Sequence, residues 1–406
     1  MKRAANVLLG VVTSIGGFVE AGSISTAAQA GSEFGLALLW AIGAAALLLA
    51  ILAEMSGRLA ALSGQTFVSA VRERLGFHYQ LALLVAELLI DLLLLTAELG
   101  GVAIALQLVT GVDYRWWLPL VAFTGALILW LGTFAVIEDG FGILGLVTLA
   151  FVVAAWKLHP AAGAVGRALL PSLPAHDPVR YAFLAVTIVG ATVSPYLINF
   201  YGSGAVEEQW TERDLPSNRI TAYLGMGFGA IVSMGVLVVA ALVLHPAHIS
   251  VHTFDDAAQA FRPVFGKWGV PVFASGLGIG CLGAAVEIAL NTGYVLAQGF
   301  GWTWGADKKR ANAARFSVAF TLMLFASMAV ALCGFDPLSV TLVSVSLTVV
   351  LMPVVVLPML VLMNDEELVR RHRSGPIGNT LLAAITVLGA VLAMIVVPLE
   401  MMGGGG

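Results

Sequence analysis

The chain has 406 residues, of which 59% are hydrophobic and 11% are charged. Soluble domains carry about 25% charged residues, so this composition excludes a string of soluble domains. The net charge of −4 indicates no nucleic-acid partner, and the sequence contains no phosphate-binding loop or nucleic-acid motif. It also offers no plausible set of nucleophile, base and orienting group, so we expect no enzyme, no catalytic residue and no cofactor.

Apolar runs of about 20 residues recur along the whole chain, which is the pattern of a polytopic helical membrane protein. Hydropathy predicts eleven spans, near residues 6–30, 34–57, 77–110, 117–136, 141–158, 181–207, 219–245, 269–300, 313–333, 338–363 and 378–401. We therefore expect one all-α transmembrane domain over residues 1–402, in contact with lipid of the cell membrane, and a flexible tail at 403–406. The sequence predicts no particular oligomeric state.

Lys and Arg residues predict the orientation of these spans. With the N-terminus inside, 14 of the 20 basic residues fall in inner loops and the other 6 fall outside. Cytoplasmic loops carry an excess of basic residues, so we expect a cytoplasmic N-terminus and an external C-terminus.

The first span contains an acid among glycines, in the stretch Glu20-Ala21-Gly22-Ser23. Glycine lets the backbone leave the helix, and a bilayer tolerates non-helical backbone only where protein or a water-filled cavity surrounds it. An acid at membrane depth is costly unless something compensates its charge. The stretch therefore predicts a break in a membrane helix, with Glu20 facing a substrate path. The alternative is a glycine kink packed on a neighbouring helix.

A second break is predicted in the sixth span, where Pro195 falls in mid-membrane. Proline removes a backbone donor and clashes with the preceding turn. Interrupted spans in corresponding positions of two halves indicate a transporter binding site within an inverted repeat. We therefore predict two five-helix repeats, about 6–158 and 181–363, with an extra helix at about 378–401.

Both breaks offer oxygen atoms and free backbone groups, and neither contains Cys, Met or His. This set suits a hard divalent cation better than a soft one. The predicted metal ligands are Glu20, Ser23 and Ser194. The wider predicted substrate-binding set is Glu20, Ala21, Ser23, Thr192, Val193, Ser194, Tyr196 and Asn199.

Further acids lie within apolar runs. The candidates for lining a path or forming a gate are Asp91, Glu98, Tyr201 and Glu287. For every buried acid (Glu54, Glu87, Asp91, Glu98 and Glu287) the role stays open between transport and packing. Charged residues inside spans almost always face the bundle interior or a cavity. Spacing places Glu87, Asp91 and Glu98 on one face of the third span.

Motifs at these positions resemble those of the NRAMP family of divalent-metal transporters over nearly the whole chain. The matching segments are Glu20–Ser23 with 29–40, Gly190–Tyr196, Ala97–Gly100, Gln298–Phe300, Asp336-Pro337 and the run from Leu357-Pro358 to Asp365. The resemblance implies the LeuT-type fold, which agrees with the predicted inverted repeat.

The departures from the family pattern concern its metal site. By the resemblance, the family's metal-binding Asp is Glu20 here, its Asn is Ser23, its soft Met ligand is Ser194 and its tenth-span Gln is Val345. Its third-span proton-path Asp falls near Leu95, and its two sixth-span histidines fall at Tyr196 and Tyr201. This pattern is similar to that of the NRAMP-related magnesium transporters.

We therefore expect a secondary transporter that moves Mg²⁺, or else Mn²⁺, by alternating access and without obligatory proton coupling. The alternative is a LeuT-fold transporter of an organic solute or another ion that has lost divalent-metal transport. A third possibility is a membrane scaffold or sensor that transports nothing, against which the two helix breaks argue.

Overall fold

The structure is a computed structural model that describes residues 19–172, 174 and 176–401. The described residues form helices and no strand. The α-helices are α2 (Ala21–Phe34), α3 (Leu39–Ser63), α4 (Phe67–Arg74), α5 (Phe77–Thr110), α6 (Tyr114–Leu131), α7 (Phe134–Gly145), α8 (Leu149–Lys157), α9 (Ala162–Ala168), α10 (Pro178–Thr192), α11 (Pro195–Glu207), α12 (Leu215–Val243), α13 (Phe254–Gln259), α14 (Arg262–Phe265), α15 (Gly269–Phe300), α16 (Ala314–Leu332), α17 (Pro337–Leu362), α18 (Glu366–Val369) and α19 (Pro376–Met401). Four 3₁₀ turns join them: η1 (Leu146–Thr148), η2 (Glu212–Asp214), η3 (His245–Ala247) and η4 (Gly266–Trp268).

Ten segments of the described chain are long and apolar enough to cross a membrane. They match the predicted second to eleventh spans, and α5 and α15 have the predicted bounds. Of the predicted first span, the structure describes the part that contains α2, and the beginning lies outside the described residues, as does the tail 403–406. The fold is therefore an all-α, polytopic membrane fold.

Local sequence signals set several helix ends. The side chains of Asp177 and Asp336 accept hydrogen bonds from backbone N–H groups at the starts of α10 and α17, and each helix then begins with proline. Gly111 ends α5 in the left-handed conformation, which glycine adopts without strain. The turn η1, which divides the predicted fifth span into α7 and α8, carries no proline and was not predicted.

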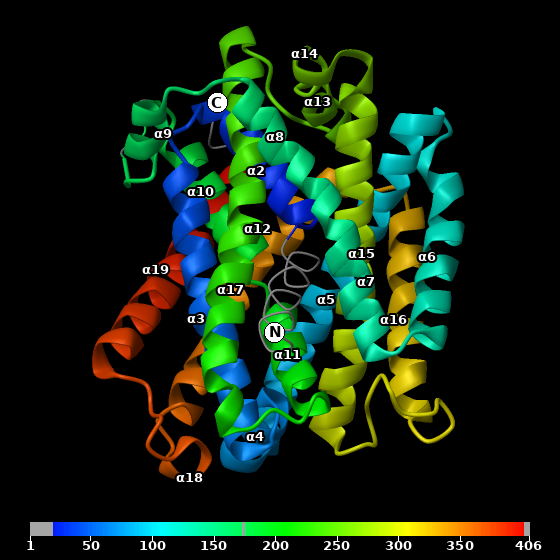
Figure 1. The fold of residues 1–406 in the computed structure, drawn as a ribbon, viewed down its shortest axis with the longest axis vertical. Coiled ribbons are helices and arrows are strands. Elements are labelled where there is room, and N and C mark those ends of the chain that lie inside the picture. Colours follow the sequence, from blue (N-terminus) through cyan, green and yellow to red (C-terminus); the bar gives the residue numbers. More distant parts are fainter. Residues whose placement is uncertain (1–18, 173, 175, 402–406) are drawn as a thin grey trace.

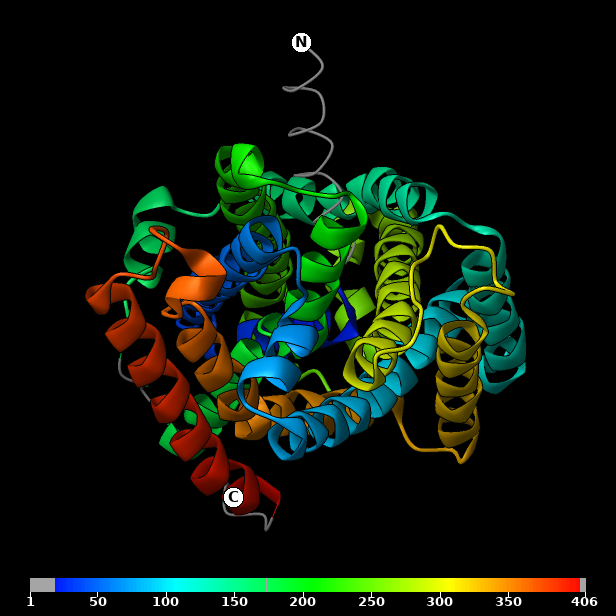
Figure 2. The ribbon, with the colours of Figure 1, turned by 90° about the horizontal axis from the view of Figure 1, so that it is seen from below.

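Two groups of helices pack mainly among themselves. One group contains α2, α3, α10, α11 and α12, and the other contains α5, α6, α15 and α16. The long helices α5 and α15 lie against each other, and α11 and α2 touch both of them across the divide between the groups (Figure 1, Figure 2).

Corresponding spans of the two predicted repeats are neighbours. The second span packs on the seventh (α3 on α12), the third on the eighth (α5 on α15) and the fourth on the ninth (α6 on α16). A pseudo-two-fold axis within the membrane plane brings corresponding helices together in this way.

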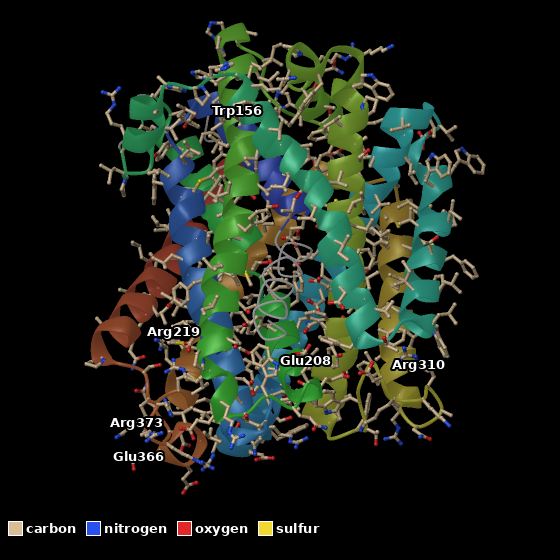
Figure 3. All side chains as sticks on the ribbon, in the orientation of Figure 1. Trp156, Glu208, Arg219, Arg310, Glu366 and Arg373 are labelled. Atoms are coloured by element: carbon tan, nitrogen blue, oxygen red, sulfur yellow. The ribbon has the colours of Figure 1, made fainter. Side chains whose placement is uncertain are left out.

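The surface reflects a lipid environment in the middle and water at the ends. Large apolar side chains in the middle of α6 are exposed, among them Phe123 at 62% and Leu127 at 48%. Arg219, Arg310 and Arg373, which the orientation expected from the sequence places on one side, lie toward the same end of the molecule, whereas Trp156 lies toward the other end (Figure 3).

Candidate functional site

The helix α2 begins at Ala21 in the protein interior, where Glu20 precedes it in extended conformation (φ −123°, ψ 174°) and is 0% exposed. The Ser23 hydroxyl donates to the carbonyl oxygen of Glu20 at 3.0 Å and accepts from the N–H of Glu20 at 3.0 Å. Ser23, predicted as a metal ligand, therefore stabilises the start of the helix and keeps one lone pair for a further partner.

The carboxylate of Glu98 anchors this helix start from α5. Its two oxygens accept from the N–H of Ala21 at 3.2 and 3.1 Å. A negative charge at a helix N-terminus is favourable because the unpaired N–H groups there carry partial positive charge. Glu98, predicted to line a path, thus holds the first break in place.

The second break separates α10 from α11. Val193 (φ −100°, ψ 65°) and Ser194 (φ −81°, ψ 133°) are not helical, and Pro195 begins α11 without a backbone N–H to donate. Ser194 is 0% exposed, and its hydroxyl has no hydrogen-bond partner among the described residues. The interruption that the sequence predicts in the sixth span is confirmed at this place.

The two breaks meet. The Tyr196 hydroxyl donates to Glu20 Oε2 at 2.9 Å, while Glu20 Oε1 has no partner among the described residues. A Cβ added to Gly22 would lie 3.3 Å from Glu20 Oε1 and 3.3 Å from the Cβ of Ala191, so α2 passes close to the end of α10. An unpartnered carboxylate oxygen and an unpartnered hydroxyl therefore lie buried at one junction.

Helix α17 closes the junction with an apolar side chain. A Cβ on Gly22 would lie 3.0 Å from Val345 Cγ1, and a Cβ on Gly190 would lie 1.9 Å from the carbonyl oxygen of Val345. A larger residue at Gly190 would push α17 away, because its Cβ would overlap backbone atoms of Val345, whereas a Cβ on Gly22 would make a tight contact with a side chain. The position that the resemblance aligns with a glutamine thus lies at the junction, where it offers no side-chain ligand.

Glu287, predicted to line a path or form a gate, lies buried on α15. No three His, Cys, Asp or Glu residues of the described chain converge as a metal-binding group. The junction therefore offers one carboxylate, a serine hydroxyl and backbone groups, which suits an ion that keeps part of its water shell.

Three predicted site residues contact other partners. The amide of Asn199 donates to Glu87, Asp91 accepts from the Thr292 hydroxyl at 3.1 Å, and the Tyr201 hydroxyl donates to Asn218 Oδ1 at 2.9 Å. Asn199 was predicted in the substrate-binding set, but its side chain contacts an acid on α5 instead of the Glu20 junction. The reason is the helical turn that separates Asn199 from Tyr196 along α11.

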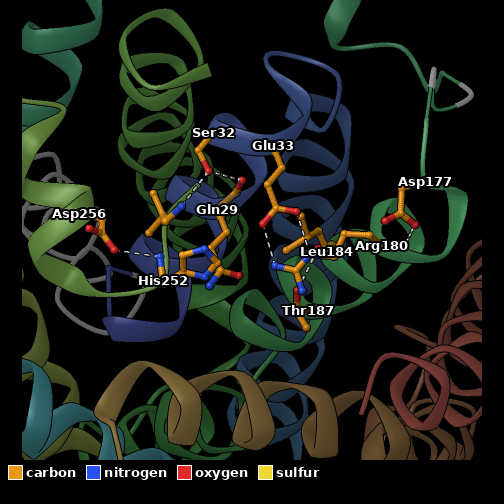
Figure 4. Close-up of polar contacts among 10 residues, drawn as sticks. Gln29, Ser32, Glu33, Asp177, Arg180, Leu184, Thr187, His252 and Asp256 are labelled. Atoms are coloured by element: carbon orange, nitrogen blue, oxygen red, sulfur yellow. Dashed lines mark hydrogen bonds and ion pairs between the residues drawn. The ribbon is translucent and has the colours of Figure 1, made fainter. Parts of the chain in front are cut away.

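Sequence reasoning missed two polar features. Asn291 and Thr292 lie in the middle of an apolar span, and that position was the signal that could have identified them. The second feature is a two-bonded ion pair from Arg180 on α10 to Glu33 on α2, with N–O distances of 2.8 and 2.7 Å, which ties these two half-helices together (Figure 4).

The comparisons with known proteins agree with this architecture. A divalent metal cation transporter MntH of Deinococcus radiodurans is 30% identical over 314 residues, which cover 71% of this chain and 68% of that protein. A MntH of Yersinia enterocolitica is 26% identical over 300 residues, covering 70% of each.

Solved structures share the fold. A manganese transporter of Eremococcus coleocola superposes with a TM-score of 0.78 at 16% identity, covering 95% of this chain and 85% of its own. Mhp1, a nucleobase-cation-symport-1 family transporter, superposes with a TM-score of 0.66 at 16% identity, covering 98% and 92%. The fold is thus the LeuT type, as expected.

The family model described as "Natural resistance-associated macrophage protein-like" matches residues 10–398. Because this match spans nearly the whole chain, the protein belongs to the Nramp family, as the motifs around Glu20 and Pro195 predicted.

Proposed function

We propose that this protein is a secondary transporter of divalent metal cations, with Mg²⁺ as the preferred substrate and Mn²⁺ as the next. The two relatives described above are named divalent metal cation transporters, which supports the class of substrate. The observation that carries the proposal is the buried junction of two broken helices, where Glu20 Oε1 and the Ser194 hydroxyl have no partner in the part of the chain that the structure describes.

Ligand chemistry favours a hard cation. Carboxylate, hydroxyl and carbonyl oxygens suit Mg²⁺ and Mn²⁺, whereas thioether and thiolate sulfur select softer metals. Ser194 occupies the place that the resemblance gives to a soft ligand, and Val345 occupies the place of an amide. In our proposal Glu20 is the charged ligand, and Ser194, Ser23 and the carbonyls of Ala21 and Val193 contact the ion or its waters. Thr192 and Tyr196 complete the pocket.

Transport proceeds by alternating access, with one helix group moving against the other around the junction. The membrane potential drives entry, because a divalent ion gains roughly 4.6 kcal/mol per 100 mV. No obligatory proton coupling is needed for that. The proposed orientation has the N-terminus in the cytoplasm and the C-terminus outside, and the proposed repeats are 6–158 and 181–363 with the extra helix 378–401.

A flux assay in proteoliposomes tests the proposal. We expect uptake of Mg²⁺ and Mn²⁺ that a negative-inside potential accelerates, without acidification of the lumen. Glu20→Gln should reduce the uptake at least tenfold, since the charged ligand is lost. Glu207→Gln is the control, because it neutralises a half-buried acid that accepts from the hydroxyl of Tyr294 instead of contacting the junction. Absence of both fluxes, or full flux in Glu20→Gln, would refute the proposal.

A further inference from the structure

A second buried polar cluster lies between α5, α11 and α15. It comprises Glu87 and Asp91 on α5, Asn199 on α11, and Asn291 and Thr292 on α15, and each of these residues is at most 2% exposed. Burying polar and ionisable side chains within membrane spans costs free energy, and such residues usually mark a functional site.

Hydrogen bonds join the cluster across three helices. The Asn291 amide donates to Glu87 Oε1 at 2.9 Å and to Asp91 Oδ2 at 3.1 Å. The Thr292 hydroxyl donates to Asp91 Oδ2 at 3.1 Å, and the Asn199 amide donates to Glu87 Oε1. The donors of the two amides and the hydroxyl are therefore directed at one side of each carboxylate.

One oxygen of each carboxylate and one of each amide remain without a partner. Glu87 Oε2, Asp91 Oδ1, Asn199 Oδ1 and Asn291 Oδ1 are buried and have no hydrogen-bond partner among the described residues. All four are acceptors, so the missing partner has to be a positively charged or proton-donating group. Carboxylate and amide oxygens in this number are the ligands that hard cations take.

The three helices that carry the cluster supply no basic side chain. The sequences of α5, α11 and α15 contain no Lys or Arg, although the cluster holds two acids. Truly buried charges need a counter-charge as well as hydrogen bonds, because their desolvation costs several kcal/mol each, by order of magnitude. A bound cation provides that counter-charge.

The cluster lies farther along two of the helices, α5 and α11, that contribute to the junction of the two breaks. Asn199 lies one turn beyond Tyr196 on α11, and Asp91 lies seven residues, or roughly 10 Å, before Glu98 on α5. It also bridges the two helix groups, because Asn199 belongs to one and the remaining four residues belong to the other.

We infer that this cluster is a second cation site, which binds a hard divalent cation that has left the Glu20 junction or is about to enter it. The inference rests on the proposed function, since it takes the same ion as cargo. Glu87 and Asp91 supply the charge, and the oxygens of Asn199 and Asn291 complete the ligand set. The site is assembled when the two helix groups adopt the arrangement seen here.

Counting bound Mn²⁺ tests the inference. Purified full-length protein is titrated with Mn²⁺, and free Mn²⁺ is measured by its electron paramagnetic resonance signal. We expect two Mn²⁺ per chain in the wild type, one in Glu20→Gln and one in Glu87→Gln/Asp91→Asn. All three substitutions in these two variants are close to isosteric, and melting curves will show that the variants are folded. Glu207→Gln should keep two.

A gain-of-affinity variant isolates the second site. In the Glu20→Gln background, Asn291→Asp adds a third carboxylate to the cluster and should tighten the one remaining Mn²⁺ at least tenfold. Thr292→Val, which removes a donor to Asp91 without removing a ligand oxygen named above, serves as the comparison and should change the affinity far less.

The outcomes separate the inference from the proposed function. One Mn²⁺ in the wild type and none in Glu20→Gln would overturn the second site and leave the transport proposal standing. Two Mn²⁺ in Glu87→Gln/Asp91→Asn would likewise place the second ion elsewhere and overturn the inference. Binding of no Mn²⁺ by the wild type would overturn both.

Discussion

At the scale of single residues, the junction is defined by what each oxygen already binds. Tyr196 occupies one oxygen of Glu20 and leaves the other open, and Ser194 has no partner among the described residues. The acid is therefore oriented before any ion arrives. Preorganised ligands bind more tightly because less ordering is needed at the moment of binding.

Removing the tyrosine hydroxyl should loosen the acid. Tyr196→Phe deletes the bond to Glu20, and hydrogen bonds to charged groups contribute about 1.5–3 kcal/mol, so we expect the KM for Mn²⁺ uptake to rise by about tenfold or more. Tyr294→Phe is the matched control, because Tyr294 is equally buried but donates to Glu207. Equal KM values in Tyr196→Phe and wild type would show that this bond does not position the ligand.

Selectivity should respond to the ligand at position 194. Ser194→Met introduces a thioether, which prefers soft metals, so Cd²⁺ should inhibit Mn²⁺ uptake at lower concentration while Mg²⁺ uptake falls. Ser194→Ala is the control for the loss of the hydroxyl alone. A Cd²⁺ inhibition curve identical in all three proteins would indicate that Ser194 does not face the ion.

At the scale of elements, each break is held by contacts from other helices. Glu98 on α5 caps α2, the Arg180–Glu33 pair ties α2 to α10, and Val345 on α17 closes over Gly22 and Gly190. The breaks themselves were predictable because glycine and proline act locally on the backbone. These contacts were not, because the partners are distant in sequence and only the tertiary packing brings them together.

The cap on α2 should contribute to stability. Glu98→Gln weakens the acceptor for the Ala21 N–H, so the free energy of unfolding should fall by about 1–2 kcal/mol, the usual value of an N-terminal cap. Thermal melting in detergent measures this. Glu367→Gln on the surface, whose ion pair with Arg74 is exposed, should cost almost nothing. A melting temperature that is unchanged in Glu98→Gln would contradict the structural role.

The ion pair between α2 and α10 can be tested by exchanging its two charges. Arg180→Glu and Glu33→Arg should each slow Mn²⁺ uptake, because like charges then separate α2 from α10. The double variant should recover much of the rate, since the pair is restored in reverse. If the double variant is as slow as the slower single variant, the pair does not couple these half-helices.

At the scale of the whole molecule, apolar run length predicted the ten spans that the structure describes, and two breaks five spans apart predicted the inverted repeat. The LeuT-type arrangement was implied by the family resemblance. The bounds of α5 and α15 were predicted accurately because a continuous apolar run marks each of these helices. The turn η1 and the short loop helices were not predicted because no long apolar run marks them. The contact between Asn199 and Glu87 was not predicted, because partners on distant helices cannot be read from one sequence.

The proposed orientation can be checked by labelling single cysteines. In a Cys281→Ser/Cys333→Ser background, Lys309→Cys should react with a membrane-impermeant maleimide only in inside-out vesicles, and Lys267→Cys only in intact cells. The background is needed because Cys333 is exposed. The reverse labelling pattern would invert the topology.

The bond between Glu98 and Ala21 crosses the divide between the two helix groups, so the proposed movement of one group against the other would break and remake it in each cycle. The amide proton of Ala21 consequently records which way the protein faces. It exchanges slowly with solvent deuterium while the carboxylate of Glu98 holds it and quickly once α2 withdraws. Deuterium uptake at this backbone amide, measured by mass spectrometry, would therefore report how often the molecule changes between its two orientations. No dye or spin probe has to be attached.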